Sequence, residues 1–400
     1  MIGRRDVLKA LGLGTTVAAL PAVSFAATPG DRRFVLVILR GAFDGLALAA
    51  PHGDRHYRAL RGELALPPPD ASNGVLELDD LFGLHPSLRN LHDGFRSGEA
   101  LVVHAVASPY RERSHFDGQD VLENGGADVG VLRDGWLNRA LAPLGSRLGS
   151  ERAIAMSQNT PLVLRGGQSV TSWAPSRLPQ AEDSTLERLQ DLYADDAFFA
   201  TRLAQALTSQ AIAAGDDGMR SDPRRGNEAA LLKSTMQATA RFLTAEDGPT
   251  IAVLEAGGWD THANQGAVAG QLANRFADLD AALAELKREL GDAWQHTVVA
   301  VATEFGRTVR VNGTRGTDHG TATAAILAGG AVAGGRVIGD WPGLADRDLY
   351  QGRDLRPTTD LRSVWKAVLQ QHIGLSASFI DRDVFPDSAA APPLPNVIRG

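Results

Sequence analysis

Continuous apolar runs recur along the chain and predict strands that are buried on both faces. Each run is short, is rich in Val, Ile, Leu and Ala, and is followed by a more polar or glycine-containing segment. A central strand of a parallel sheet needs this composition, because helices cover both faces of such a sheet. The runs are Phe34–Leu39, Ala100–Val106, Thr250–Leu254, Thr297–Val301 and Ala324–Leu327.

Between these runs, apolar residues recur at steps of three and four, which predicts amphipathic helices. One helix runs from Leu272 to Leu290, a helical region lies between about 180 and 245, and a last helix spans about 359–373. A further helix is predicted by the spacing of Leu84, Leu88, Leu91 and Phe95. Strands that alternate with helices indicate an α/β fold with a largely parallel central sheet and helices on both faces.

The first 26 residues have the pattern of an export signal. Arg4 and Arg5 precede a weakly apolar run, Ala10–Leu20, and Ser24-Phe25-Ala26 gives the small-x-small pattern that signal peptidase recognises. A twin arginine ahead of such a run is typical of a Tat signal peptide. The alternative is an uncleaved membrane anchor, but the run is shorter than the roughly 20 apolar residues that a span needs. We expect a Tat signal peptide over 1–26 and a single domain over 27–400.

Charge and cysteine content narrow the class of protein further. The formal net charge is -7 and the sequence pI is about 5.8, whereas a nucleic-acid-binding protein usually carries a basic stripe. The chain has no cysteine, so no disulfide would stabilise it in an oxidising compartment. We expect a periplasmic or secreted protein that meets the Tat translocase during export. It should bind no nucleic acid and, after leader cleavage, no membrane.

Acidic residues and histidines follow three of the predicted strands. In open α/β sheets, ligands bind beyond the carboxyl ends of the strands. Carboxylates and imidazoles gathered at that edge suit a divalent cation such as zinc. The candidate metal ligands are Asp44, Asp260, His262, Glu304, Asp318 and His319, with Glu255 as a weaker candidate.

Structural roles compete with these metal-ligand roles. Asp44 follows the first strand and could equally cap a turn or the next helix. Asp260 and His262, one residue apart, can point to the same side of the backbone, but they could also be a turn aspartate and an exposed histidine. Inside the strand Ala100–Val106, His104 is interpreted as a core histidine whose hydrogen bonds are satisfied.

Ser114 is the candidate nucleophile. With Asp117 three residues later it resembles a capping box, which predicts a helix that begins at Ser114. A hydroxyl at a helix N-terminus lies at the positive end of the helix dipole, where anions bind and an alkoxide costs less. Arg113 and Arg307 are candidates for binding the anion. The alternative is a serine that only caps the helix.

Six segments resemble an uncharacterised family of Tat-exported bacterial proteins that carry a domain of unknown function, placed in the alkaline phosphatase/sulfatase-like superfamily. The segments run through most of the chain that would remain after leader cleavage. They are LRGAFDGL (39–46), FGLHPSL (82–88), VVHAVASPYRERSHFDGQD (102–120), GWDTHANQ (258–265), TEFGRTVRVNGTRGTDHG (303–320) and GGRVIGDWPGL (334–344).

The resemblance implies an alkaline phosphatase-like fold and a site that holds one or two divalent ions (Zn, Mn, Mg or Ca). Asp44 matches the first metal carboxylate of that superfamily and Ser114 its nucleophile. Asp260 with His262 matches the middle metal pair, and Asp318 with His319 a later pair or final histidine. The chain departs from the usual Thr-Ala-Asp-His-Gly segment, because it has Phe305, which cannot ligate a metal, in that region.

Two functions follow from this resemblance. The first is an exported metal-dependent hydrolase in which Ser114 attacks a small anionic phosphate or sulfate ester. The second is a non-catalytic binding or assembly protein with a degenerate metal site. An α/β-hydrolase serine esterase and a P-loop enzyme are disfavoured, since the chain contains neither G-x-S-x-G nor G-x-x-x-x-G-K.

Overall fold

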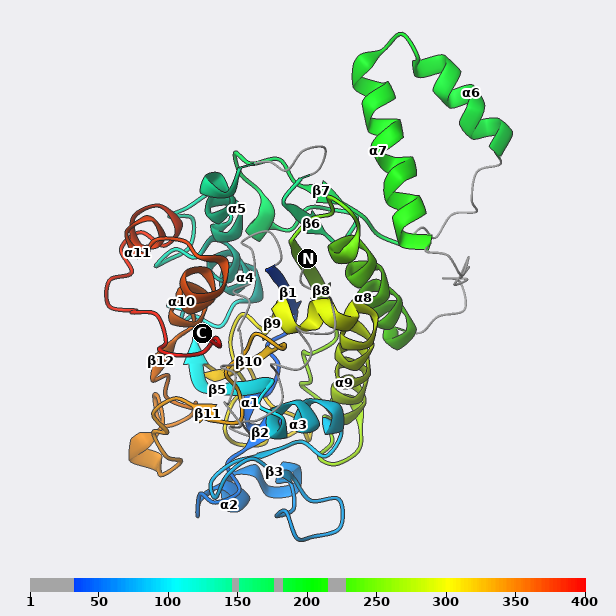
Figure 1. The fold of residues 1–400 in the computed structure, drawn as a ribbon. Coiled ribbons are helices and arrows are strands. Elements are labelled where there is room, and N and C mark those ends of the chain that lie inside the picture. Colours follow the sequence, from blue (N-terminus) through cyan, green and yellow to red (C-terminus); the bar gives the residue numbers. More distant parts are fainter. Residues whose placement is uncertain (1–31, 146–150, 176–182, 215–227) are drawn as a thin grey trace, which may run out of the picture.

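A computed structural model describes residues 32–145, 151–175, 183–214 and 228–400. The predicted signal peptide, residues 1–26, lies outside these ranges. Among the described residues, none of the helices is both long and apolar enough to cross a bilayer. The described chain builds one large central sheet, helices on both of its faces, and a helical arm (Figure 1).

The central sheet has nine strands, most of them parallel. β1 pairs in parallel with both β8 and β9, whereas β10 is antiparallel to its neighbours β9 and β5. No helix lies between β9 and β10 to carry the chain back across the sheet, so β10 returns antiparallel. In sheet order, the strands are β11 (Val337–Ile338), β5 (Ala100–Ala107), β10 (Thr323–Ala328), β9 (Thr297–Ala302), β1 (Arg33–Leu39), β8 (Ile251–Ala256), β6 (Ala153–Ala155) and β7 (Thr171–Ser172), with β12 (Thr359–Asp360) also paired to β5.

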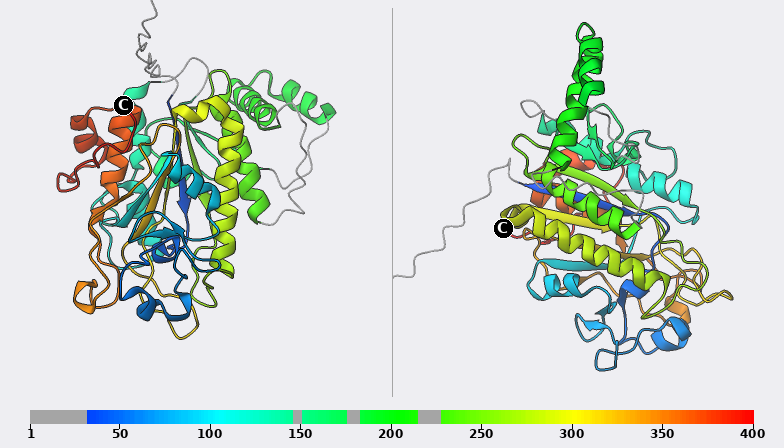
Figure 2. Two further views of the ribbon diagram at one scale, coloured as in Figure 1. Left: turned by 60° about the horizontal axis from the view of Figure 1, so that its bottom comes forward. Right: turned by 90° about the vertical axis from the view of Figure 1, so that its right-hand side faces the viewer.

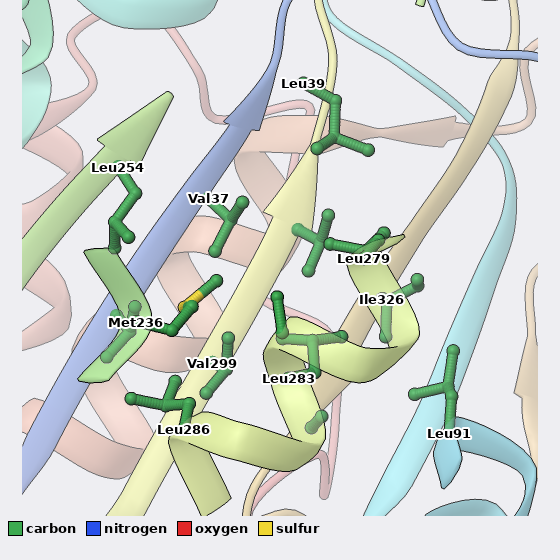
Figure 3. Close-up of a cluster of buried hydrophobic side chains, with 14 of the residues drawn as sticks. Val37, Leu39, Leu91, Met236, Leu254, Leu279, Leu283, Leu286, Val299 and Ile326 are labelled. Carbon is green, nitrogen blue, oxygen red and sulfur yellow. The ribbon is translucent and has the colours of Figure 1, made fainter. Parts of the chain in front are cut away.

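Alternate side chains of the central strands enter two separate hydrophobic cores. In β1, Val35, Val37 and Leu39 face one core and Phe34, Leu36 and Ile38 face the other. The first core packs against α3 (Arg89–Arg96), α8 (Glu228–Thr244) and α9 (Gln271–Leu290), and Figure 3 shows its leucines and valines between α9 and the strands. The second packs against α4 (His115–Asn124), α5 (Trp136–Leu141) and α10 (Leu361–Ala367). The predicted α/β fold with helices on both faces is therefore confirmed.

Shorter elements surround this body. A small antiparallel sheet joins β2 (Ala49–Ala50), β4 (Gly83–Leu84) and β3 (Leu76–Glu77), beside α1 (Gly45–Leu48) and α2 (Tyr57–Arg61). Single 3₁₀ turns cover Gly62–Leu64, Ala142–Leu144, Leu162–Leu164, Gly291–His296 and Asp346–Asp348. Near the C-terminus, α10 continues into π turns at Val368–Ile373 and, after α11 (Ala377–Phe379), at Ile380–Val384.

Two helical predictions have different outcomes. The helical region between about 180 and 245 is confirmed by α6 (Asp183–Tyr193), α7 (Ala197–Ala214) and α8, and α6 and α7 project from the body as an arm (Figures 1 and 2). The helix expected from Leu84 onward was placed too early, because Leu84 belongs to β4 and α3 begins at Arg89. Pro86 explains the difference, since a proline disfavours helical backbone in the residue before it.

Core leucines of α9 should determine stability. Leu279 is fully buried against the sheet (Figure 3), so Leu279→Ala removes apolar burial and leaves a cavity. We expect a loss of about 2–5 kcal/mol in the free energy of unfolding, measured by urea denaturation. Leu231→Ala, at a position 39% exposed on α8, is the matched control and should cost less than about 1 kcal/mol. Equal losses for both variants would contradict this packing.

His104 and His372 should make stability depend on pH. Burial lowers the pKa of each from 6.5 to about 4, although each donates a hydrogen bond to a backbone carbonyl, His104 to Ala49 O and His372 to Arg33 O. In the unfolded chain the two histidines become protonated below about pH 6.5, but in the folded chain only below about pH 4. Stability is therefore complete above pH 6.5 and falls through this window, by at most about 3 kcal/mol per histidine.

Unfolding titrations at pH 7 and pH 4.5 measure this effect. His104→Gln and His372→Gln should each reduce the loss of stability between the two pH values. A loss as large as that of the wild type would contradict the assignment. The satisfied core histidine predicted at position 104 is confirmed, because both of its ring nitrogens bond the backbone, at Ala49 O and Ala105 N.

Candidate metal centre

Loops beyond the carboxyl ends of β8 and β9 bring together histidines that are far apart in the sequence. Asp260 and His262 follow β8, and His319 lies in the long loop between β9 and β10. His115 joins them from the first turn of α4, which follows β5. We name these four residues the imidazole cluster: His115, Asp260, His262 and His319.

The ring nitrogens of the cluster converge on the Asp260 carboxylate. Oδ1 of Asp260 lies 3.0 Å from His262 Nε2 and 3.2 Å from His319 Nε2. The Nε2 atoms of His262 and His319 are 2.9 Å apart, and His115 Nε2 is 3.4 Å from Asp260 Oδ2. Ligand atoms around a tetrahedral zinc ion are about 3.3 Å apart, given bonds of about 2.0 Å. His115, Asp260 and His319, whose ligand atoms lie within 4.8 Å of one another, therefore have the spacing that a bound ion requires.

Glu304 binds the imidazole of His115 at Nδ1, the ring nitrogen that does not face Asp260. Its Oε1 is 2.7 Å from His115 Nδ1, and the carboxylate also accepts hydrogen bonds from Gly41 N, Gln119 Nε2 and Thr303 Oγ1. Burial alone would raise the pKa of Glu304, but these donors lower it to about 2. The same hydrogen bond to Glu304 raises the pKa of His115. Glu304, predicted as a metal ligand, faces the Nδ1 atom of His115 in this structure.

Of the other two imidazoles, His319 is hydrogen-bonded at Nδ1, whereas His262 Nδ1 only faces a carboxylate. His319 Nδ1 is 2.9 Å from the carbonyl oxygen of Arg113, and His262 Nδ1 is 3.6 Å from Asp318 Oδ1. Asn312 Nδ2 donates to Asp318 Oδ1 at 2.9 Å and keeps that carboxylate in place. Metal-binding histidines usually use the nitrogen that faces away from the metal in this manner, which fixes ring orientation and tautomer. All three Nε2 atoms consequently face the centre of the cluster.

Asp260 is anchored by a buried arginine. Arg307 Nη1 donates to Asp260 Oδ1 at 2.6 Å, and the remaining guanidinium donors bind Thr317 Oγ1 and Thr317 O. Burial acts to raise the pKa of Asp260, but the hydrogen bond and charge of Arg307, with His262 and His115, lower it overall. Next to it, Trp259 is buried against Phe276 and fixes the backbone.

A close backbone approach makes this arrangement possible. Gly41, after β1, has φ +120°, and a Cβ atom there would lie 2.6 Å from Asp260 N. The same glycine donates its N–H to Glu304. Any other residue would be strained at this φ and would push the Asp260 segment away, so glycine is required at this strand end.

The donor set fits a metal ion. The Nε2 atom of His115 is buried and has no hydrogen-bond partner, which is costly for a polar atom unless something else binds it. Ligand atoms of His115, Asp260 and His319 lie within 4.8 Å of one another. Three imidazoles and one carboxylate suit zinc and related ions, whereas calcium and magnesium prefer oxygen ligands.

Phe305 lines the cluster without filling it. Its ring stacks on His115, with centroids 5.0 Å apart, and lies 5.2 Å from His319. The ring is 2% exposed, so it forms an apolar wall beneath the imidazoles. Such a wall restricts the ring positions of the two histidines.

Ser114 stands at the N-terminus of α4, next to His115. It occupies the N-cap position, but its side chain makes no capping hydrogen bond. The predicted capping box is therefore wrong: Asp117 lies 3.4 Å from Tyr110 Oη instead, and Tyr110 Oη accepts from the backbone N–H of Ser114. The Ser114 hydroxyl is thus not used for capping.

The two candidate anion-binding arginines are already paired. Arg113 Nε donates to Asp354 Oδ2 at 2.8 Å, and its Nη2 donates to Gln351 Oε1. Its backbone has φ +63°, an uncommon value for a non-glycine residue, which aims its carbonyl at His319. Arg307 is committed to Asp260, as described above. Both arginines act on the cluster by holding its members.

Asp44 lies outside the imidazole cluster. Its carboxylate is buried, pairs with Arg61, and accepts a hydrogen bond from Gln265 Nε2 at 2.8 Å. It also accepts from the N–H groups of Leu46 and Ala47 as the N-cap of α1, which is the alternative role weighed for it. Similarly, Glu255 binds Arg40 rather than a cluster member.

His115 is the member of the imidazole cluster that the sequence analysis did not single out. It stands between the candidate nucleophile Ser114 and an exposed Phe116, and its acidic neighbour Asp117 was assigned to a capping box rather than to a metal pair. One signal was available: like the other candidates, it follows a buried strand, β5, at a loop-to-helix junction. Its partner Glu304 lies 189 positions away, so their contact depends on the fold.

Removing one imidazole should abolish zinc binding. At 100 times its Kd, Zn²⁺ should stabilise the folded protein by about 2.7 kcal/mol. We therefore expect it to raise the melting temperature of the purified protein. His319→Ala should remove this shift, because it deletes an inward-facing Nε2 atom. His92→Ala is the control, since His92 bonds Glu77 O away from the cluster. An unchanged zinc shift in His319→Ala, measured by scanning calorimetry, would contradict the assignment.

Three solved structures illustrate which proteins resemble this one. An inactive variant of murine ectonucleotide pyrophosphatase/phosphodiesterase 5 in complex with AMP has 11% identity and a TM-score of 0.32, with 69% of this chain and 57% of that chain covered. The PsFucS1 sulfatase from Pseudoalteromonas sp. has 11% identity, a TM-score of 0.38 and coverages of 87% and 68%. The C-terminal periplasmic domain of EcEptC from Escherichia coli, in complex with Zn, has 12% identity, a TM-score of 0.40 and coverages of 90% and 88%.

At these identities and TM-scores, the structural likeness carries no inference about activity. The present chain spans little more than half of the murine protein. No curated protein sequence matches the chain. The family described as "Protein of unknown function (DUF1501)" matches residues 31–384, so the chain belongs to that family.

Proposed function

We propose that this protein is an exported metal-dependent hydrolase of phosphate or sulfate esters. The observation that carries the proposal is the imidazole cluster, in which three Nε2 atoms gather at one carboxylate while the Nδ1 atoms of His115 and His319 are hydrogen-bonded from outside. Groups held in this way are preorganised for a ligand. The donor set favours a zinc ion over magnesium or calcium.

The imidazole cluster and Ser114 would have different roles in this reaction. Asp260, His262, His319 and His115 would hold the ion, which would act as a Lewis acid on an ester oxygen. Ser114 would attack the phosphorus or sulfur atom with its free hydroxyl, forming a serine ester and releasing the alcohol, and water would then hydrolyse that ester. The N–H groups of the first turn of α4 face the same anion and favour its negative charge.

The arginines have a positioning role in this mechanism. Arg307 holds Asp260 and Arg113 holds His319 through its carbonyl, so the anion's charge would be balanced by the ion and by the α4 N-terminus. In this mechanism neither arginine binds the substrate anion directly. We propose a small anionic ester as the substrate.

Export by the Tat translocase is part of the proposal. Arg4 and Arg5, the short apolar run after them and the absence of cysteine support a periplasmic or secreted location. Tat carries folded proteins, so an ion could be loaded before transport. We propose that the protein acts there without nucleic-acid or membrane partners.

A non-catalytic binding or assembly protein is the second candidate. One observation favours it: Asp44, which the superfamily resemblance assigns to a metal, pairs with Arg61 instead. Both arginines predicted to bind the substrate anion are also paired with carboxylates. Such a protein would bind the ion but turn over no ester.

Replacement of the candidate nucleophile separates the two functions. With zinc or manganese present, the wild type should hydrolyse members of a panel of aryl phosphate, phosphodiester and sulfate esters, and Ser114→Ala should lower kcat by at least about 100-fold because it removes the attacking oxygen. Zinc affinity, measured by calorimetry, should change little. Ser97→Ala is the control, since Ser97 only bonds Gly94 O at the end of α3.

Turnover that persists in Ser114→Ala would rule out the serine as nucleophile. A wild type that binds zinc but hydrolyses no ester of the panel would favour the binding protein. Absence of both zinc binding and turnover would contradict the hydrolase.

A further inference from the structure

A continuous chain of buried polar side chains runs from α2 to the metal-binding carboxylate. Each member contacts the next through a hydrogen bond or an ion pair, although the members come from four different segments. We name it the buried polar chain, and its members in order are Arg61, Asp44, Gln265, Thr317, Arg307 and Asp260. We propose that the buried polar chain positions Asp260 for metal binding, and that Gln265 and Thr317 are positioning residues of the centre.

The far end of the chain is a fixed charge pair. Asp44 and Arg61 are 1% and 0% exposed and form an ion pair. Arg61 Nη1 also donates to the carbonyl oxygens of Thr308 and Val309. Asp44 Oδ1 accepts from Leu46 N and Ala47 N, and Asp44 Oδ2 accepts from Arg61 Nη2. Asp44 therefore presents only acceptor oxygens to its next neighbour.

The side-chain amide of Gln265 is held in one orientation by its hydrogen bonds. It donates from Nε2 to Asp44 Oδ2 at 2.8 Å. Its Oε1 then accepts from Thr317 Oγ1 at 2.8 Å and from Thr261 Oγ1 at 2.9 Å. A flipped amide would face Oε1 to the Asp44 carboxylate and Nε2 to both hydroxyls. Asp44 thus allows only one amide orientation.

Thr317 completes the connection to the cluster. Arg307 can only donate, so Thr317 Oγ1 accepts from its Nε at 3.1 Å and must use its own proton toward Gln265. The Arg307 Nη2 group donates to Thr317 O at 2.7 Å. These two bonds fix the guanidinium plane, and the remaining Nη1 then meets Asp260 Oδ1 at 2.6 Å. Each hydrogen bond from Gln265 to Asp260 therefore has a defined donor and a defined acceptor.

Burial distinguishes this arrangement from an ordinary surface network. Gln265 and Thr317 are fully buried and Arg307 is 1% exposed, whereas the Asp260 side chain is 42% exposed. Asp260 is therefore the end at which the chain reaches solvent and the imidazoles. Hydrogen bonds between buried side chains fix their relative positions, so the chain ends in a carboxylate that is held toward the proposed ion. Outer partners of this kind typically contribute 10–100-fold to metal affinity.

The test uses two substitutions at one position. Thr317→Val keeps the shape and removes the hydroxyl, and Thr317→Ser keeps the hydroxyl and removes a methyl group. Zinc affinity of the full chain, measured by calorimetry with ZnCl₂ alone, should fall at least 10-fold in Thr317→Val and stay within about 3-fold in Thr317→Ser. A role limited to packing would predict the opposite order or no difference.

Thr239→Val is the matched control for general destabilisation. Thr239 is also fully buried, but its Oγ1 donates to Thr235 O within α8, outside the buried polar chain. It should lower the melting temperature and leave zinc affinity unchanged. If Thr317→Val is not recovered in folded form, Gln265→Glu gives the same test, because a carboxylate there cannot donate to Asp44 and should also weaken zinc binding at least 10-fold.

The inference rests on the proposed metal centre, and the two can fail separately. A wild type that binds zinc together with a Thr317→Val variant of equal affinity would overturn the role of the buried polar chain and leave the proposed function intact. A wild type that does not bind zinc would overturn the metal centre itself, and with it this positioning role.

Discussion

Burial of the central sheet on both faces is the constraint on which the rest of the structure depends. Side chains of β1, β8 and β9 alternate between two hydrophobic cores, and these strands are apolar except near their ends. Functional side chains are left to the loops at the strand ends. Because these three strands are parallel, their carboxyl ends share one edge, and the loops that follow them meet there.

At that edge, the fold separates the groups that would touch a ligand from the groups that hold them. The carboxylates of Glu304 and Asp318 and the carbonyl of Arg113 each face the Nδ1 atom of a histidine. Arg307 performs the same task for Asp260. Acidic residues, histidines and arginines predicted to bind a metal or an anion are therefore divided between two layers. The inner layer is the imidazole cluster, and the outer layer is the set of groups that bind its members. Only the inner layer faces the common centre.

The helical arm formed by α6 and α7 has no part in this centre. It projects from the body beside α8 (Figure 1), and Phe198 and Phe199 on it are exposed. The body, by contrast, is closed by long-range contacts such as the pairing of α9 with β1 and β9 through the first core. The candidate site is supported by that body, since Trp259 and Phe305, the side chains beside it, are buried in it.

The sequence by itself determined the strands, most of the helices and the strand ends at which polar residues gather. Apolar periodicity is a local property, and it survives folding because it is the cause of burial. It also located Asp260, His262 and His319. It did not reveal His115, nor that Glu304 would orient an imidazole and Asp44 would pair with Arg61. These roles depend on partners 17 to 189 positions away, and such distances become contacts only when the sheet order and the loops are fixed. The tertiary structure alone decided which carboxylate faces the centre and which one supports it.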